Sequence, residues 1–261
     1  MLKTIIKPQK DRNNDSAQNN SHGIVVRKVN KSFGKKQVLK DIDLEVPCGH
    51  IYGLLGPSGC GKTTLVKIIA GILEATSGDA YVLGQPMPQL SLMNKVGYMA
   101  QSDALYGSLT AEENLQFFGA IYGMKKGEIK KRTAEVLELV NLTEHLRKPV
   151  QSYSGGMKRR LSLAMAILHK PPVLVLDEPT VGIDPLLRRS IWAELNNLAI
   201  DGVTILVTTH VMDEADKCHS LAMMRDGRLI AKGTARELQE KIGVTSIEDA
   251  FIHYGGQNYE S

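Results

Sequence analysis

Nine consecutive residues carry the strongest signal in this chain: Gly56-Pro57-Ser58-Gly59-Cys60-Gly61-Lys62-Thr63-Thr64. They fit the pattern Gly-x-x-x-x-Gly-Lys-[Ser/Thr], in which glycines let the backbone curl until several N–H groups point at one phosphate. The lysine adds a point charge for the outer phosphates, and the next hydroxyl can hold Mg²⁺. A helix opening at Lys62 adds the positive end of its dipole. This glycine loop is therefore predicted to bind phosphates, with Thr63 also a metal ligand; a purely structural glycine turn is the alternative.

The sequence on either side of the glycine loop agrees with this interpretation. Residues 51–55 form a short apolar run, as expected of a buried strand, and residues 65–73 are apolar on nearly all sides, as expected of a buried helix. Strand, glycine loop and helix in this order are what a phosphate-binding loop requires. Cys60 lies where any small residue suffices, and a reactive thiol is not expected because only the helix terminus could activate it.

The composition limits the class of protein. With 261 residues, 43% of them hydrophobic, the chain can build one large domain or two small ones. The net charge of +4 does not suggest a general nucleic-acid binder. No apolar stretch approaches the roughly 18 residues that span a bilayer, so the protein is not expected to cross a membrane by itself. The cysteines are few and show no pairing pattern, which favours a reduced, cytosolic setting: Cys48, Cys60 and Cys218.

The two ends of the chain differ from the rest. Residues 1–22 are polar, cannot bury apolar area and are predicted to form a disordered tail. The alternative for this segment is a basic contact with lipid, through Lys3, Lys7 and Lys10. A short C-terminal tail is expected at residues 256–261, which leaves residues 23–255 for the folded domain.

The first half of the folded region is predicted to hold strands and then helices. Residues 24–29 and 38–46 read as strands, which suggests an antiparallel region before the glycine loop. Residues 110–113, Thr-Ala-Glu-Glu, form a capping box that opens a helix. Residues 128–140 have the pattern of a second, amphipathic helix. A helical subdomain is therefore expected over about residues 100–170.

After residue 170 the pattern returns to alternating strands and helices. Residues 173–176 and 203–207 are continuous apolar runs, typical of buried parallel strands. Asp184-Pro185 supplies a helix N-cap and a proline at the first helical position, and Asp226-Gly227 predicts a hairpin turn. The whole pattern predicts an α/β fold: a P-loop NTPase core of mostly parallel sheet flanked by helices, with an antiparallel β subdomain and an α-helical subdomain.

Three side chains at predicted strand ends suggest hydrolytic chemistry. Asp177 and Glu178 directly follow the strand at 173–176, and adjacent residues there point in different directions. Asp177 is expected to hold Mg²⁺ through its water shell, and Glu178 to act as general base on a water. His210 ends another strand, at the edge where open α/β sheets place their ligands, and is expected to orient the water. The alternatives are a plain charged turn and a structural histidine.

A second anion site is predicted at Ser154-Gly155-Gly156. Ser154 can cap the helix predicted over residues 157–169, and the two glycines permit close approach of an anion to its N-terminus. One chain does not obviously need two such sites for one nucleotide. The presence of a second anion site is explained if that site binds a nucleotide that a second molecule supplies.

Together, the glycine loop, the acidic strand end and the run Ser152-Tyr153-Ser154-Gly155-Gly156-Met157 resemble the nucleotide-binding subunit of an ATP-binding cassette (ABC) transporter. The resemblance extends from Gly23 to about Tyr254. Two departures occur in the signature run, where Tyr153 replaces the commonest leucine and Met157 the commonest glutamine. Both are conservative for an anion site made by the backbone. The form with Met157 resembles subunits of drug and polyketide-antibiotic exporters.

The resemblance assigns expected roles to three more residues. Gln101 matches the glutamine loop that touches Mg²⁺ and water and senses the membrane partner; the alternative is a plain loop residue. Asp184 matches the loop that crosses between subunits, and it can also be only the helix N-cap. Phe33 matches the aromatic ring that stacks on adenine, or is an ordinary aromatic residue at a strand end.

The resemblance implies a mechanism and partners. ATP, with Mg²⁺, would lie between the glycine loop of one subunit and Ser154–Gly156 of a second nucleotide-binding subunit, most simply an identical copy. Opening and closing of the pair would drive a separate transmembrane permease subunit, most simply for export. The helical region over about 100–170 would hold the docking groove. The protein would thus be peripheral, on the cytoplasmic face of the cell membrane.

Two alternatives of other classes stay open. The first is a soluble, non-transport ABC ATPase that acts on nucleic acid or the ribosome, although the paired cassettes or long insertions usual in such proteins are not visible. The second is a module that binds ATP without hydrolysing it, against which the intact Glu178 and His210 argue.

Overall fold

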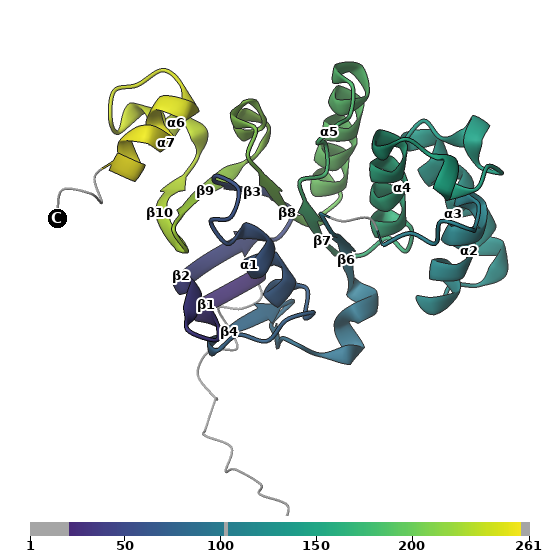
Figure 1. Ribbon diagram of the computed structural model, residues 1–261, viewed down its shortest axis with the longest axis horizontal. Helices are drawn as coiled ribbons and strands as arrows, with labels where there is room; N and C mark the ends of the chain where they lie inside the picture. The colour runs from purple at the N-terminus through teal and green to yellow at the C-terminus, as the bar shows by residue number, and fades with distance from the viewer. Residues whose placement is uncertain (1–20, 102–103, 257–261) are drawn as a thin grey trace, which may run out of the picture.

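A computed structural model describes residues 21–101 and 104–256 of the chain (Figure 1). Its central element is a six-stranded sheet with the order β10-β9-β3-β8-β7-β6, in which all neighbours run parallel except β10 and β9. The strands are β3 (Ile51–Leu55), β6 (Val96–Met99), β7 (Val173–Asp177), β8 (Thr204–Thr209), β9 (Ser220–Arg225) and β10 (Arg228–Gly233). The strands predicted at 51–55, 173–176 and 203–207 are confirmed as β3, β7 and β8, which are buried along their whole lengths.

A second sheet is entirely antiparallel, with the order β2-β1-β4-β5. Its strands are β1 (His22–Phe33), β2 (Lys36–Pro47), β4 (Ser77–Val82) and β5 (Gln85–Pro86). The antiparallel region expected before the glycine loop is confirmed, but it also recruits β4 and β5 from beyond that loop. Strand β1 starts at His22, which is two residues before the predicted strand and one residue before the expected start of the folded domain at Gly23. Residues 1–20 and 257–261, which include most of both predicted tails, lie outside the described residues.

Helices cover the two faces of the parallel sheet differently. Helix α1 (Lys62–Ile69) and the antiparallel sheet share one hydrophobic core with the side of β7 that carries Val173 and Val175. Helices α4 (Gly155–Ile167) and α5 (Pro185–Ile200) share the other core, with Leu174 and Leu176 of the same strand. Since alternate strand residues point to opposite faces, α1 and α4 lie on opposite faces of the parallel sheet.

The helices of the middle region gather at one end of the molecule, beyond β6 (Figure 1). They are α2 (Ala111–Ile121), α3 (Lys126–Leu139) and α4, and the short 3₁₀ turns Thr143–His145 and Val150–Ser152 lie between α3 and α4. The predicted capping box opens α2: the Thr110 hydroxyl accepts from the Glu113 N–H at 3.2 Å, and the Glu113 carboxylate accepts from the Thr110 N–H at 2.8 Å. The helix predicted at 128–140 is α3.

The C-terminal part closes the other end of the molecule. Strands β9 and β10 form the predicted hairpin, with φ of 48° at Asp226 and 79° at Gly227, as a two-residue turn of this type requires. It is followed by α6 (Ala235–Glu240) and α7 (Ile247–Gly256), which lie far from α2 and α3 in Figure 1. A 3₁₀ helix at Met212–Lys217 precedes β9.

Helix boundaries differ from their predictions by one or two residues at α3 and α4, and by four at the end of α1. The apolar run at 65–73 predicted a helix to residue 73, but α1 ends at Ile69. The reason is Gly71, whose φ of 73° lies in the left-handed region and ends the helix. The residues that do lie in α1 are buried as predicted: Leu65, Val66, Ile68 and Ile69.

Candidate functional site

The glycine loop connects β3 to α1, as predicted, and two of its glycines are required by their surroundings. A Cβ at Gly56 would lie 2.3 Å from the carbonyl oxygen of Met224 on β9. Gly61 has φ of 112°, and a Cβ there would lie 2.9 Å from Leu39 Cδ2. The loop is thus pressed against β2 and β9, and only glycine lets its backbone follow this path. Pro57, Ser58 and Gly59 at its tip are exposed.

Lys62 starts α1 and is almost fully buried, with an exposed fraction of 5%. Its ammonium donates to the carbonyl oxygens of Gly56 at 2.7 Å and Pro57 at 3.1 Å, so its charge is held inside the loop. Within the described part of the chain, no side chain caps the N-terminus of α1. The free N–H groups of its first turn and the ammonium together suit an anion at this place. Thr63 and Thr64 follow in this turn and are partly buried.

The surroundings of Cys60 indicate a structural role for this residue. Its N–H donates to Pro57 O at 3.3 Å, and its carbonyl accepts from the Gly227 N–H at 3.1 Å, which ties the loop to the β9–β10 hairpin. Burial raises the pKa of the Cys60 thiol, although the nearby Lys62 opposes this. A thiol with a raised pKa is a poor nucleophile, so the environment agrees with the expectation that Cys60 is not reactive.

Asp177 and Glu178 lie beside the end of β8 and use their side chains differently, as predicted. Asp177 ends β7 and pairs with Thr208 in the sheet register. Its side chain is buried, and Oδ1 accepts a hydrogen bond from the Thr208 hydroxyl. Its Oδ2 is also buried but has no hydrogen-bond partner among the described residues. A buried carboxylate oxygen without a partner is costly, and a metal-bound water would satisfy it.

Glu178 turns toward His210. Its φ of 54° lies in the left-handed region, and its N–H donates to both the carbonyl and the hydroxyl oxygen of Thr208 at 3.1 Å. Oε1 of Glu178 lies 2.9 Å from Nδ1 of His210. The carboxylate is mostly buried, with 11% of the side chain exposed, whereas His210 has 42% exposed. The structure therefore joins two side chains that are 32 residues apart in sequence and were each predicted to be functional.

These groups lie at one edge of the parallel sheet. Leu55, the last residue of β3, is in register with Thr209, and Asp177 with its neighbour Thr208. The glycine loop starts after Leu55, and His210 follows Thr209. We call this set, residues 56–64 with Asp177, Glu178 and His210, the nucleotide edge. Ligands of open α/β sheets bind at the carboxyl ends of the strands, which is where this set lies.

The predicted second anion site lies at the start of α4. The Ser154 hydroxyl accepts from the Met157 N–H at 3.2 Å and caps the helix as predicted. Gly155 is exposed, and a Cβ at Gly156 would lie 2.9 Å from the carbonyl oxygen of Gly182. The loop after β7 thus packs closely on this helix terminus. Because α4 covers the face of the sheet opposite to α1, this site and the glycine loop belong to different faces.

The remaining predicted site residues are exposed. Asp184 caps α5, since its Oδ1 accepts from the Leu187 N–H at 3.0 Å; this is one of the two roles left open for it. Phe33 ends β1 with 51% of its surface exposed, and the Lys31 ammonium lies 5.1 Å from its ring centroid. Gln101 follows β6 and is exposed. The roles of these residues toward a second subunit, adenine and Mg²⁺ stay predictions.

Sequence reasoning missed Arg159 and Thr208, which hold the nucleotide edge together. Arg159 of α4 is buried and donates to the main-chain carbonyls of Gln101 and Glu178. A signal was present in the sequence: Arg159 precedes Leu163 by four residues and Ala166 by seven, so it falls on the buried stripe of its helix. A charged residue on such a stripe needs buried polar partners.

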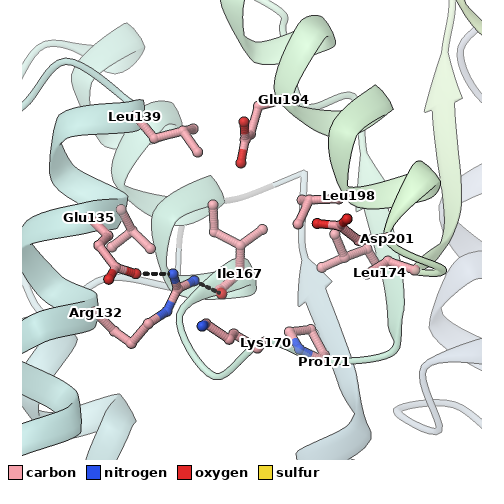
Figure 2. A pocket seen from close by; sticks show the side chains of 12 residues that line it. Arg132, Glu135, Leu139, Ile167, Lys170, Pro171, Leu174, Glu194, Leu198 and Asp201 are labelled. Carbon is pink, nitrogen blue, oxygen red and sulfur yellow. Dashed lines mark hydrogen bonds and ion pairs between the residues drawn. The ribbon is translucent and has the colours of Figure 1, made fainter.

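A cavity of about 440 Å³ lies away from the nucleotide edge, between α3, the end of α4 and α5 (Figure 2). None of the predicted site residues lines it. Arg132 at its wall pairs with Glu135 and donates to the carbonyl oxygen of Ile167 at 2.9 Å (Figure 2). It also donates to the carbonyl oxygen of Leu168 at 3.0 Å. These bonds cap the last turn of α4, which is a structural role.

The strand, glycine loop and helix, with an acidic residue pair at a neighbouring strand end, define a P-loop NTPase core. The sequence profile of the family described as ABC transporter matches residues 39–181, and the chain belongs to this family. It is therefore an ATPase, and it acts as the ATP-binding and ATP-hydrolysing subunit of a transporter. The signature run at the start of α4 and the helical region around it agree with this assignment.

Similar proteins agree in sequence and in structure. The linearmycin resistance ATP-binding protein LnrL of Bacillus subtilis (strain 168) is 40% identical over 237 residues, covering 86% of this chain and 76% of that protein. The Nod factor export ATP-binding protein I of Rhizobium meliloti is 40% identical over 244 residues, covering 92% of this chain and 72% of that protein. The probable multidrug ABC transporter ATP-binding protein YbhF of Escherichia coli (strain K12) is 41% identical, covering 83% of this chain but 38% of that protein.

Solved structures of ATP-binding cassettes share the fold. An ATP-binding subunit of an ABC transporter superposes with a TM-score of 0.83 and 27% identity, covering 89% of this chain and 99% of that one. The cassette MJ0796, in a dimeric post-hydrolysis state with ADP and Pi, superposes with a TM-score of 0.76 and 26% identity, covering 81% of this chain and 98% of that one. These matches favour the transport interpretation over a cassette that acts on nucleic acid or the ribosome.

Proposed function

We propose that this chain hydrolyses ATP with Glu178 as the general base and thereby powers export by a separate membrane subunit. The observation that carries the proposal is the nucleotide edge itself. There the Glu178–His210 pair, joined at 2.9 Å, lies beside a buried Asp177 oxygen and a loop suited to phosphate. The proposed base, orienting group and anion site would thus share one sheet edge, as hydrolysis of a phosphoanhydride requires.

The donor set at this edge fits Mg²⁺. Asp177 offers a buried oxygen that has no partner among the described residues, and Thr63 offers a hydroxyl in the first turn of α1. Gln101, which follows β6 in the sequence, offers an exposed amide. Oxygen donors with few carboxylates suit a metal that keeps several of its waters. When bound with ATP, the ion would neutralise charge on the outer phosphates. Thr63, Gln101 and, through water, Asp177 are the residues that would hold it.

The protein residues have separate tasks in the proposed reaction. Lys62 would exchange its contacts with Gly56 O and Pro57 O for phosphate oxygens, because a charged acceptor makes the stronger bond. Glu178 would accept the proton of the attacking water. His210 would hold that water and the terminal phosphate in line, while its Nδ1 stays bonded to Glu178.

Two copies are proposed to complete each ATP site. Ser154–Gly156 and the glycine loop start helices on opposite faces of one parallel sheet, so a single nucleotide does not obviously use both within one chain. A second copy, turned head to tail, can bring its Ser154–Gly156 to the phosphates of the first. Asp184 would then lie near the crossing between the subunits, and Phe33 would stack on adenine.

The membrane partner is proposed to dock on an exposed hydrophobic surface. A cavity of about 620 Å³ lies between η2 (Leu90–Lys95), the end of α1 and the end of α2. We call it the apolar groove and define it by Ile72, Leu90, Met93, Phe118, Ile121 and Tyr122. Leu90 is 89% exposed and Ile121 is 61% exposed. Large apolar side chains gathered in this way mark an interaction site.

The occupant that suits the apolar groove is a short helix of the permease, presenting apolar side chains to it. Among residues 21–101 and 104–256, no helix is long and apolar enough to cross a bilayer. The translocation path is proposed to belong to the partner, which would also hold this chain at the cytoplasmic face of the membrane. Export is proposed because the names of several relatives are those of resistance and export proteins. The groove uses residues 70–98 as well as the helical region in which docking was expected.

Replacing Glu178 by Gln tests the proposal. Loss of the base should lower ATP turnover at least about 100-fold, since general base catalysis typically contributes this much or more. ATP affinity, measured by isothermal titration calorimetry, should stay within about threefold, because Lys62 and the glycine loop are unchanged. Glu194→Gln on α5 is the matched control and should keep full turnover. Normal turnover in Glu178→Gln would exclude Glu178 as the base.

A further inference from the structure

One buried arginine connects three functional segments of the chain. Arg159 lies in the second turn of α4 and has an exposed fraction of 7%. Its Nη1 donates to the carbonyl oxygens of Ala100 at 2.6 Å and Gln101 at 2.9 Å. Nε and Nη2 donate to Glu178 O at 3.0 and 2.7 Å, and Nη2 also donates to Asp177 O. All four of these acceptors are main-chain oxygens, so through these bonds the guanidinium fixes the backbone.

The Asp177 carbonyl ends β7, and the other three lie just beyond the ends of β6 and β7, where the chain leaves the sheet. A buried carbonyl that has left its ladder needs another donor. A guanidinium has five N–H groups in a rigid planar fork and can serve several carbonyls at once, whereas an ammonium is a point donor on a flexible stem. Arg159 therefore holds the segment that carries Gln101 and the segment that carries Glu178 at a fixed separation.

The backbone of Glu178 needs this support. Its φ of 54° is unfavourable for a residue with a Cβ and persists only when the surroundings impose it. Thr208 binds the N–H of Glu178, and Arg159 binds its carbonyl. The peptide groups on both sides of the Cα are thus held, which aims the carboxylate at His210 Nδ1, 2.9 Å away.

We propose that Arg159 is a positioning residue for hydrolysis, which sets the direction of the Glu178 carboxylate and the place of Gln101 without touching ATP. The proposal rests on the proposed role of Glu178 as the base. Arg159 also follows Ser154–Gly156 on the same helix, and Gly156 packs on Gly182 in the loop after Glu178. The helix terminus offered to a second copy is thereby rigidly connected to the base of this copy.

The test compares two neighbouring arginines of α4. Arg159→Lys keeps the positive charge but removes the fork; Arg159→Gln is a second variant in case the buried ammonium prevents folding. Arg160→Lys is the control, because Arg160 donates to Val140 O at 3.1 Å and Asn141 O at 2.9 Å, away from the nucleotide edge. Steady-state ATPase kinetics and the melting temperature are measured for each folded variant, well below its melting transition.

The proposal requires a specific kinetic pattern. Either Arg159 variant should lose at least about tenfold in kcat, since a misplacement of about 1 Å in a catalytic group can lower the rate by that much or more. KM for ATP should stay within about twofold, because the glycine loop is not touched. Arg160→Lys should keep kcat within about twofold, even if its melting temperature falls as far as that of Arg159→Lys.

Three outcomes would overturn the proposal: wild-type kcat in a folded Arg159 variant, an equal loss of kcat in Arg160→Lys, or a raised KM with kcat unchanged. The Glu178→Gln variant distinguishes a failure of this proposal from a failure of the proposed role of Glu178, on which it rests. If Glu178→Gln is inactive while Arg159→Lys and Arg159→Gln turn over normally, only the positioning role is wrong. If Glu178→Gln turns over normally, the proposed base is wrong.

Discussion

The nucleotide edge and the apolar groove differ in how complete they are within one chain. At the nucleotide edge, polar groups are mostly buried and bonded: Lys62 to two loop carbonyls, Glu178 to His210, and Asp177 to Thr208. In the apolar groove, large hydrophobic side chains face solvent, with Leu90 at 89% exposure. The first region has the order that chemistry requires, and the second has the exposed surface that a partner would cover.

This difference indicates that the nucleotide edge serves ATP chemistry and that the apolar groove serves docking. Preorganised polar groups lower a reaction barrier because they need not rearrange when charge develops, so they must be rigid before the substrate arrives. A docking surface gains its free energy by removing apolar area from water on association, so it must be exposed before the partner arrives. Variants in the two regions should therefore separate ATP chemistry from coupling to the membrane.

The largest effect on nucleotide binding is expected from Lys62→Ala at the nucleotide edge. It removes a buried ammonium aimed into the glycine loop, and one charge-assisted hydrogen bond contributes about 1.5–3 kcal/mol. ATP affinity should thus fall about 10- to 100-fold, measured by calorimetric titration. Lys67→Ala, in the last turn of the same helix, is the control and should bind normally. Equal affinity in Lys62→Ala and wild type would mean that the ammonium stays on Gly56 O and Pro57 O.

Loss of permease binding without loss of ATP turnover is expected from Leu90→Asp combined with Ile121→Asp in the apolar groove. Two carboxylates should prevent burial of this surface and abolish co-purification with the permease, because unpaired charges are costly to bury. ATP turnover of the isolated chain should stay within about twofold of wild type. Ile200→Asp, at the end of α5, changes another exposed isoleucine outside the groove and should leave the complex intact. Retention of the permease by the double variant would place docking elsewhere.

The nucleotide edge could be predicted from sequence to a large extent, and the reason is local. The glycine loop, the Asp177–Glu178 pair and His210 each follow a short apolar run of the kind that is typical of a buried strand. Parallel strands bring their carboxyl ends to one edge, so the assembly of these segments follows from strand direction alone. The same locality explains why the capping box at Thr110 and the Asp226-Gly227 turn are where the sequence places them.

The parts that could not be predicted depend on contacts between distant segments. Strand β4 reads Ser-Gly-Asp-Ala-Tyr-Val, with too little apolar pattern to stand out, and it exists because it pairs with β1 about 50 residues earlier. The apolar groove is assembled from separate segments, residues 70–98 and 118–123. The role of Arg159 depends on which carbonyls end near α4, and no short sequence window contains that information.

A moderate, pH-dependent effect on the free energy of unfolding is expected from His169, which contacts Tyr122 of the apolar groove. Its ring stacks on Tyr122 with 3.7 Å between centroids, and burial, assisted by Arg132, lowers its pKa to about 4. The folded state thus favours neutral His169, so its contribution to stability is complete above about pH 6.5 and is lost as the pH falls toward 4. The loss should be on the order of 2–3 kcal/mol.

His169→Phe keeps a ring for the stack with Tyr122 but cannot take up a proton. Urea unfolding measured from pH 7.5 to 4.5 should therefore show a shallower loss of stability in His169→Phe than in wild type. Identical slopes would show that His169 is not a source of acid sensitivity, and that the wall of the groove tolerates a charged ring.

The smallest effect is expected from Thr110→Ala, which removes the N-cap of α2, one wall of the apolar groove. A lost threonine cap lowers the free energy of unfolding by about 1 kcal/mol. The same change at Thr234 removes an equivalent capping box from α6, away from the groove. Both variants should thus lose similar stability in urea, but only Thr110→Ala should weaken permease binding, because it loosens the helix that carries Phe118 and Ile121. Equal weakening by both variants would mean that permease binding follows overall stability rather than the order of α2.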